Sequence, residues 1–183
     1  PLLIKKRLVI GFFSRFLLEK GFNDFINIIF NSYLVELEFD FIIGGSEDIF
    51  NPSSINLDYI KAKYPNLNIQ INPNYNEFFE LIDILLFCSY REGDPHFLLK
   101  SMSYGVVPVV YPVPGVVNNI INNYNGLIAQ YVNPTALLSC LYYLNKNRHE
   151  LQSLSTNALK YTSNFTEDNV NNIISKKILE LTK

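Results

Sequence analysis

The feature that most constrains the fold is an alternation between short apolar runs and longer amphipathic segments. The first apolar run is Leu8–Phe13, and residues from Gly21 to about Leu34 follow it with apolar side chains at helical spacing. An uninterrupted apolar run of roughly four to eight residues is typical of a parallel strand buried on both faces. Helices between such strands cover the sheet. The pattern therefore predicts a doubly wound α/β domain.

The same alternation continues along the chain. Further strands are expected at Phe39–Ile43, Leu67–Ile71, Ile84–Cys88, Val107–Tyr111 and Gly126–Ala129. Helices are expected at Ile55–Lys63, Glu77–Asp83, Phe97–Tyr104 and Val116–Ile121, and throughout the chain from Pro134 onward. Gly44-Gly45 and Gly105 are interpreted as the ends of elements, because glycine interrupts regular structure. With no repeat and no charge-rich linker among the 183 residues, one domain is expected.

Composition excludes several classes of protein. Hydrophobic residues make up 48% and charged residues 17%, against roughly 25% in average proteins, which favours a packed core over disorder. The net charge of −2 and the absence of a basic stripe argue against a nucleic-acid partner. The uncharged stretch between Lys100 and Lys146 contains prolines and asparagines that break it well short of a membrane span. Cys88 and Cys140 show no metal-ligand spacing and are expected in a core, in a reducing compartment.

Two loops at predicted strand ends carry the candidate chemistry. Ligands of doubly wound sheets bind outside the carboxyl ends of the strands. After the first strand, Arg15 and Lys20 precede a helix N-terminus, where backbone N–H groups favour an anion. After the fourth expected strand, Glu92 and Gly93 precede another helix. Cations beside a helix are more often simply solvated, but the two loops together favour a phosphate site.

These residues resemble the donor-binding half of retaining GT-B glycosyltransferases, the glycosyl transferases of group 1, also called family 4. Members carry a Gly-Arg-Leu…Glu-Lys-Gly loop, which here is Ser14-Arg15-Phe16…Glu19-Lys20-Gly21. Members also carry Pro-Ser-x-x-Glu-Gly…Leu-Leu-Glu-Ala-Met-Ala-x-Gly-x-Pro-Val-Val. In this motif, seven residues lie between the two Glu. The corresponding run here extends from Cys88 to Val110. Asn125-Gly126-Leu127-Ile128 also matches, so the resemblance covers Leu8 to Leu181.

The resemblance implies a Rossmann-like domain that binds a nucleotide-diphosphate sugar as a substrate, without a metal or another cofactor. Arg15 and Lys20 would hold the diphosphate and Glu92 would contact sugar hydroxyls, which makes these three the candidate catalytic residues. The base would lie against Ile71-Asn72-Pro73. The implied donor-binding positions are Ser14, Asn72, Pro73, Gly93, Asp94, Pro95, His96, Phe97, Leu98 and Lys100.

The resemblance also implies partners. Residues 1–183 would be the donor domain, and an acceptor domain would lie upstream, in keeping with a chain that opens on Pro1 rather than methionine. Together the two domains would transfer a sugar, with retention, to a glycan or lipid-linked acceptor, whereas the isolated domain is expected to be inactive. The expected location is the cytoplasm, with the full-length protein at the inner face of the membrane.

Three positions depart from the family pattern. Lys100 stands where the second Glu is expected, Ser14 replaces a glycine, and Asn118 replaces a Glu that follows a glycine pair, here Pro114-Gly115. An ammonium cannot accept the two ribose hydrogen bonds of a carboxylate. A non-catalytic GT-B-like module that has lost full donor competence is therefore the alternative. A dinucleotide oxidoreductase is a poor third, because Phe12-Phe13-Ser14 follows Gly11 in place of a G-x-G-x-x-G motif.

Aromatic and histidine residues outside these loops receive structural interpretations. The Phe residues between 22 and 30, together with Tyr142 and Tyr143, fall at helical spacing and are expected in the core. His149 lies in a charged segment and is expected at the surface.

Overall fold

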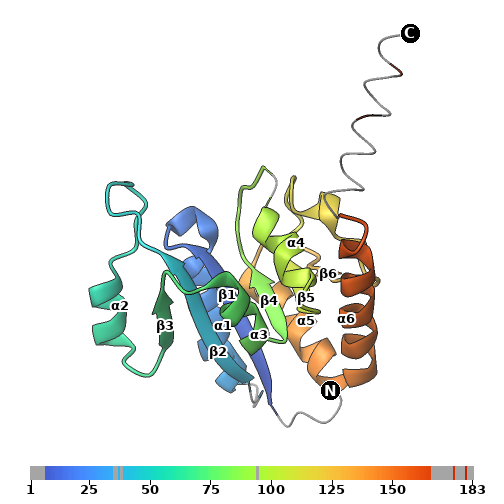
Figure 1. The fold of residues 1–183 in the computed structure, drawn as a ribbon. Helices are drawn as coiled ribbons and strands as arrows, with labels where there is room; N and C mark the ends of the chain where they lie inside the picture. The colour runs from blue at the N-terminus through green and yellow to red at the C-terminus, as the bar shows by residue number, and fades with distance from the viewer. Residues whose placement is uncertain are drawn as a thin grey trace.

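The computed structural model describes residues 7–165 except 35, 36, 38 and 94, together with residues 175 and 180. Within these residues, six strands form one sheet in the order β3-β2-β1-β4-β5-β6, and every neighbouring pair is parallel (Figure 1). The strands are β1 (Leu8–Arg15), β2 (Phe39–Ser46), β3 (Asn68–Ile71), β4 (Ile84–Phe87), β5 (Val107–Val110) and β6 (Leu127–Ile128). The predicted doubly wound parallel sheet is confirmed.

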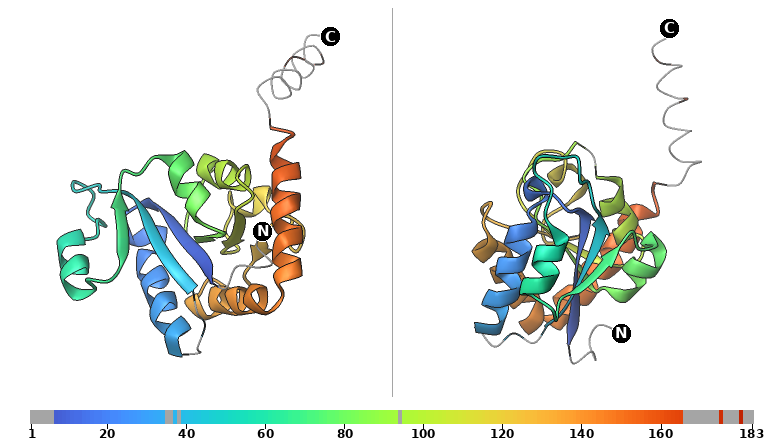
Figure 2. Two further views of the ribbon diagram at one scale, coloured as in Figure 1. Left: turned by 60° about the horizontal axis from the view of Figure 1, so that its bottom comes forward. Right: turned by 90° about the vertical axis from the view of Figure 1, so that its left-hand side faces the viewer.

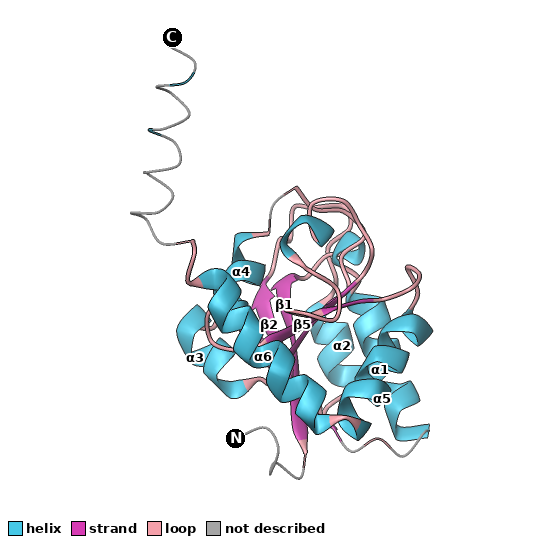
Figure 3. Cartoon of the chain, turned by 90° about the vertical axis from the view of Figure 1, so that its right-hand side faces the viewer, coloured by secondary structure: helices cyan, strands magenta, loops and turns pink. Residues whose placement is uncertain are grey.

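Helices cover both faces of this sheet. They are α1 (Phe22–Leu34), α2 (Leu57–Lys63), α3 (Tyr75–Leu81), α4 (His96–Met102), α5 (Pro134–Lys146) and α6 (Arg148–Thr162), with 3-10 turns η2 (Leu18–Lys20) and η3 (Val117–Asn119). Figure 3 shows α3, α4 and α6 on one side of the strands and α1, α2 and α5 on the other, and the right-hand view of Figure 2 shows the strands between two helical layers. No helix in the described part of the chain is long and apolar enough to cross a membrane.

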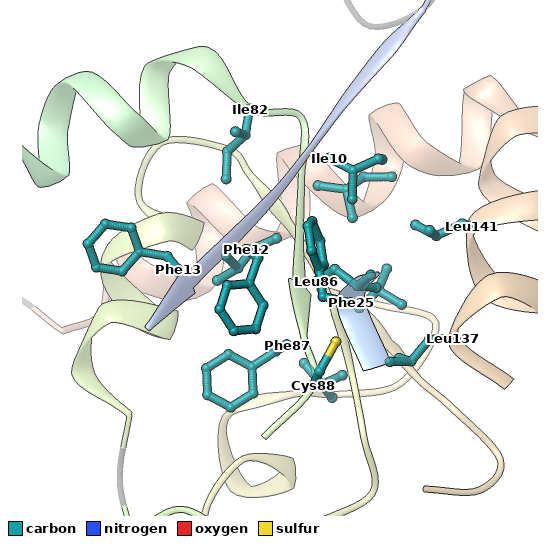
Figure 4. Close-up of a cluster of buried hydrophobic side chains, with 14 of the residues drawn as sticks. Ile10, Phe12, Phe13, Phe25, Ile82, Leu86, Phe87, Cys88, Leu137 and Leu141 are labelled. Carbon is teal, nitrogen blue, oxygen red and sulfur yellow. The ribbon is translucent and has the colours of Figure 1, made fainter. Parts of the chain in front are cut away.

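The core explains why β1 is held rigidly. Successive side chains of a strand point to opposite faces, so Phe12 packs on Phe25 of α1 while Phe13 packs on Phe78 of α3. Figure 4 shows the two rings on opposite sides of the strand. Because β1 is buried on both faces, the position of its carboxyl end is fixed by packing from both layers.

Two strand ends differ from the sequence prediction. β1 continues to Arg15, so Ser14 and Arg15 belong to the strand, and β2 continues through Gly44-Gly45 to Ser46. The cause is parallel pairing of the last residues, with Ser14 opposite Gly45 and Arg15 opposite Ser46. A Cβ on Gly44 would lie 2.5 Å from the Phe78 ring, so this glycine makes room for a core aromatic instead of ending the strand.

Several smaller expectations also change. The predicted helix Val116–Ile121 is only the 3-10 turn η3. Tyr142 and Tyr143 are 49% and 44% exposed, because the buried stripe of α5 is Leu137, Leu141 and Leu144 and positions 142 and 143 fall outside it. Phe30, near the end of α1, is likewise 41% exposed. These aromatic residues were wrongly placed in the core.

Other expectations hold or fall outside the described residues. His149 is exposed, as predicted, and Cys88 is buried while Cys140 is half-buried against the core. The helical prediction from residue 166 onward lies outside the described residues, apart from the two isolated positions.

Candidate functional site

The strand order reverses between β1 and β4, and the two predicted loops meet there. β1 leads toward β2 and β3 on one side, whereas β4 begins the series β4-β5-β6 on the other. In open α/β sheets such a reversal opens a crevice beyond the carboxyl ends of the strands, which is where ligands bind. Lys20 follows β1 and Glu92 follows β4, so topology places both at this crevice.

Lys20 and Glu92 form a shielded ion pair. Lys20 Nζ donates to Glu92 Oε1 at 2.7 Å, and the two side chains are only 14% and 12% exposed. Charge-assisted hydrogen bonds of this length are among the stronger ones, and removing one partner of a sheltered pair leaves the other charge poorly solvated. The structure thus brings together two of the three residues predicted to be catalytic.

Backbone contacts hold the two loops against each other. Tyr90 N donates to Glu19 O at 3.0 Å, and Ser89 Oγ donates to the same carbonyl at 3.4 Å. Gly21 has φ +73°, and a Cβ there would lie 2.1 Å from Cys88 O. Only glycine allows this approach, so the end of β4 and the start of α1 are locked at contact distance.

Arg15 has a different carboxylate partner. Its Nη1 donates to Asp48 Oδ2 at 2.8 Å, with the side chains 53% and 29% exposed. Nearby, Ser53 Oγ donates to Glu19 Oε2, and this bond is the main cause that lowers the pKa of Glu19. The loop after β2 therefore forms a wall of the site. Sequence reasoning gave no role to any residue of this wall, although an acidic pair, Glu47 and Asp48, directly after a strand was the available signal.

A hollow of about 310 Å³ lies beside Arg15. It brings together five predicted donor-site residues, Ser14, Arg15, Asn72, Pro73 and Phe97, and adds Phe13, Gly45, Ser46 and Tyr75. Asn72 adopts φ +51°, and its N–H donates to Gly45 O at 2.7 Å. Asparagine tolerates this left-handed conformation, which turns the chain sharply after β3. Tyr75, exposed at the start of α3, was missed; its position after a strand end was the only signal.

The remaining predicted residues lie around the start of α4. Gly93 and His96 are exposed, Pro95 is buried, and the Leu98 side chain faces the core while its N–H donates to Pro95 O. Asp94 lies outside the described residues. Gly115, at φ +83°, packs on this segment, since a Cβ there would lie 2.2 Å from Gly93 O.

Two of the three substituted family positions, Lys100 and Asn118, are at the surface, whereas Ser14 is buried. Lys100 is exposed on α4, and its Nζ lies 5.3 Å from the centroid of the Tyr104 ring. Lys100 is not among the residues that line the hollow beside Arg15. Asn118 is exposed in η3. In the described part of the chain, no group of three His, Cys, Asp or Glu side chains is placed to hold a metal ion.

A buried hydrogen bond between two side chains joins elements that lie next to the site. Tyr111 Oη donates to Asp24 Oδ2 at 2.6 Å, joining the end of β5 to the first turn of α1, and the Tyr90 ring stacks on Tyr111 at 6.1 Å. Burial is the main cause that raises the pKa of Tyr111, so the phenol stays a neutral donor. Tyr111 and Asp24 are 87 positions apart, and no sequence signal linked them.

Comparison with known proteins identifies the family. The profile described as "Glycosyl transferases group 1" matches residues 1–161. The chain belongs to this family. It is 26% identical over 178 residues to N,N'-diacetylbacillosaminyl-diphospho-undecaprenol alpha-1,3-N-acetylgalactosaminyltransferase from Campylobacter jejuni, a match that covers 97% of this chain and 45% of the relative. The predicted membership of the group 1 glycosyltransferases is confirmed.

Solved structures of group 1 transferases and related proteins share the fold. HepE from Anabaena in complex with UDP-glucose superposes with a TM-score of 0.76 and 15% identity, over 96% of this chain and 49% of HepE. The C-terminal domain of the group 1 protein LpcC from Francisella tularensis gives a TM-score of 0.70 and 16% identity, over 85% of this chain and 84% of that domain. The predicted Rossmann-like GT-B architecture is confirmed. The chain spans about half the length of HepE and of the Campylobacter relative.

Proposed function

We propose that this chain is the donor domain of a glycosyltransferase that binds a nucleotide-diphosphate sugar and, with an acceptor domain N-terminal to it, transfers the sugar with retention to a glycan or lipid-linked acceptor. The observation that carries the proposal is the sheltered Lys20–Glu92 pair at the strand reversal, beside the hollow that Arg15 lines. HepE, which shares the fold, is described in complex with UDP-glucose, which supports this class of donor.

The chemistry follows from the charges that these residues supply. Glycosyl transfer releases a nucleoside diphosphate, on which negative charge develops as the glycosidic bond breaks. Arg15 and Lys20 stabilise that charge, and the Lys20 ammonium has three donors, so it serves a phosphate oxygen and Glu92 together. Glu92 accepts from a sugar hydroxyl, and the base lies in the hollow near Pro73 and Tyr75. With two cations in place, the proposal requires no metal ion or cofactor.

The acceptor belongs to the same proposal. The Campylobacter relative is named for a diphospho-undecaprenol substrate, which supports a lipid-linked acceptor and a full-length protein that works in the cytoplasm at the membrane surface. A thermal-shift panel of UDP, GDP and ADP and their glucose conjugates tests donor binding, because a ligand that binds only the folded state raises the melting temperature. A panel in which none of these raises it contradicts the proposal.

Replacing Glu92 by glutamine tests the division of labour between sugar and diphosphate. We expect Glu92→Gln to weaken binding of the nucleotide sugar by about 1.5–3 kcal/mol, the range for a hydrogen bond to a charged group, while binding of the free diphosphate stays nearly unchanged. Titration calorimetry with UDP-glucose and UDP measures both affinities. Glu150→Gln, which changes an exposed carboxylate at the start of α6, is the control. Equal losses for the two ligands would show that Glu92 does not recognise the sugar.

A second candidate function is a binding module without transfer activity. Lys100 and Asn118 favour it, because both replace carboxylates of the family pattern and both lie at the surface. Turnover of a nucleotide sugar by the full-length protein separates the two functions, since only the enzyme would release the diphosphate.

Lys100→Glu tests the ribose position directly. We expect this substitution to tighten UDP binding by about 1–3 kcal/mol, because a carboxylate accepts hydrogen bonds from both ribose hydroxyls. Calorimetry at two ionic strengths measures the change, with Lys100→Gln as the uncharged control. Weaker binding that falls less steeply with salt than in the parent chain would make Lys100 a phosphate ligand, because the substitution removes an attraction that salt screens. Unchanged binding would place position 100 outside the site and remove the ribose assignment.

A further inference from the structure

A second hollow, of about 520 Å³, lies between the edge strand β6 and helix α5. Its volume exceeds that of the hollow beside Arg15, about 310 Å³, and the two share no lining residue. We infer that this hollow is a second binding site and that its ligand is a short neutral oligosaccharide. The inference rests on the proposed function in one respect, namely that the protein acts on glycans.

The lining chemistry selects an uncharged, hydroxyl-rich ligand. Eight of the twelve lining residues carry an amide or a hydroxyl group in the side chain, and none of the twelve is charged. The sequence around the hollow is equally neutral, because no charged residue or histidine occurs between Lys100 and Lys146. A phosphate or carboxylate ligand would find no cation among these residues. The first turn of α5 offers it little in addition, because Pro134 has no N–H and Asn133 Oδ1 already accepts from Ala136 N, so nucleotides and acidic sugars are disfavoured. Amide and hydroxyl groups set beside aromatic rings and apolar side chains suit a sugar, which has both hydroxyls and C–H faces.

Two exposed tyrosines supply the ring surfaces. Tyr131, just after β6, is 59% exposed, and Tyr143, on α5, is 44% exposed, and both line the hollow. Gln130 Nε2 donates to Tyr131 Oη at 3.0 Å. Tyrosine combines an apolar ring with a polar tip, which is the combination that packing against a sugar ring requires. Tyr143, one of the two tyrosines that were wrongly expected in the core, is thus available to contact a sugar ring in this hollow.

Two side-chain amides that line the hollow are held in place by hydrogen bonds to their oxygen atoms. Asn122 Oδ1 accepts from Ile128 N at 2.9 Å, and Asn133 Oδ1 accepts from Ala136 N at 2.8 Å at the start of α5. These bonds hold the amides in place through their oxygens, and an asparagine amide also has two N–H donors. Fixed amides that can donate match the oxygen atoms of a neutral sugar, at little cost in side-chain entropy on binding.

An added peptide strand is the competing occupant of a sheet edge, and the backbone of β6 opposes it. Ala129 N donates to Val110 O at 2.9 Å, toward β5, so the N–H of Ile128 points to the outer side of the edge. Asn122 Oδ1 already accepts from that N–H. Strand addition depends on main-chain hydrogen bonds along the edge, and this one is taken by a side chain. The observations therefore favour a glycan.

Calorimetry and saturation-transfer NMR with maltotriose and N,N',N''-triacetylchitotriose test the inference on the 183-residue chain. We expect at least one trisaccharide to bind with a Kd in the millimolar range or tighter. Tyr143→Ala and Tyr131→Ala should each weaken that binding about tenfold, since a ring contact is lost. Tyr142→Ala is the matched control, because Tyr142 is the adjacent residue of α5, is similarly exposed at 49%, and is not among the lining residues.

The outcomes distinguish this inference from the proposed donor site. Binding of UDP should be unchanged in the Tyr131 and Tyr143 variants, and trisaccharide should bind equally with and without UDP. A chain that binds UDP but neither trisaccharide overturns the second site and leaves the donor proposal standing. Equal losses in the Tyr142 and Tyr143 variants, or competition between trisaccharide and UDP, also overturn it. Trisaccharide binding that depends on Tyr131 and Tyr143 in a chain without UDP affinity supports the second site alone.

Discussion

Replacing Gly21 by alanine is expected to lower the free energy of unfolding by about 2–5 kcal/mol. The left-handed conformation of Gly21, at φ +73°, costs an L-residue roughly 1–2 kcal/mol. The added Cβ would also lie 2.1 Å from Cys88 O, a backbone atom at the end of β4 that cannot rotate away. Overpacking of this kind costs roughly 1–3 kcal/mol more. Urea unfolding followed by circular dichroism measures the loss.

Gly93→Ala is the matched control for this prediction. A Cβ at Gly93 would have no heavy atom within 4 Å, so its unfolding free energy should stay within about 0.5 kcal/mol of the parent chain. If both variants lose similar stability, then the effect comes from glycine replacement in general and the contact between Gly21 and β4 is not responsible.

Replacing Lys20 by alanine is expected to weaken binding of a nucleoside diphosphate by at least about 1.5–3 kcal/mol, or roughly 10- to 150-fold. The ammonium is lost as a phosphate donor, and the Glu92 carboxylate, only 12% exposed, loses its counter-charge and repels the diphosphate. Both changes act in the same direction. Titration calorimetry with UDP measures the affinity.

Two variants make the Lys20 prediction specific. Lys63→Ala removes an exposed cation that lies over the Tyr59 ring of α2 and over the Tyr64 ring, which follows α2. This variant should leave UDP affinity unchanged. A Lys20→Ala/Glu92→Ala double variant should recover stability relative to Lys20→Ala, since no unpaired carboxylate remains, without recovering full affinity. Wild-type affinity in Lys20→Ala would remove Lys20 from the diphosphate site.

The order of strands and helices could be predicted from the sequence because a strand that is buried on both faces of the sheet is a local run of apolar residues. Ile84–Phe87 is a run of four apolar residues, and all four are buried in β4. Lys20 and Glu92 could be assigned to one site, although they are 72 positions apart, because the carboxyl ends of parallel strands share one edge. That rule needs only the topology, without any side-chain detail.

The contacts that sequence reasoning missed depend on pairing register. Arg15 reaches Asp48 because β1 and β2 pair through their last residues, which carries both strands beyond their predicted ends. Considered locally, a Gly-Gly pair favours the end of a strand. Only the Phe78 ring packed on Gly44 shows that this glycine makes room for a core side chain inside β2. Such contacts join elements that a single-sequence pattern treats one at a time.

The pairing of each site cation with its own carboxylate also bears on how fast a ligand arrives. Arg15 with Asp48 and Lys20 with Glu92 leave little net charge at the crevice, in a chain whose formal charge is −2. A cleft with a large excess of positive charge speeds the diffusional encounter of an anion, and that acceleration fades with salt. For the proposed diphosphate ligand, we therefore expect an encounter governed by unsteered diffusion and orientation, with selectivity set by the lifetime of the bound complex and not by its rate of formation.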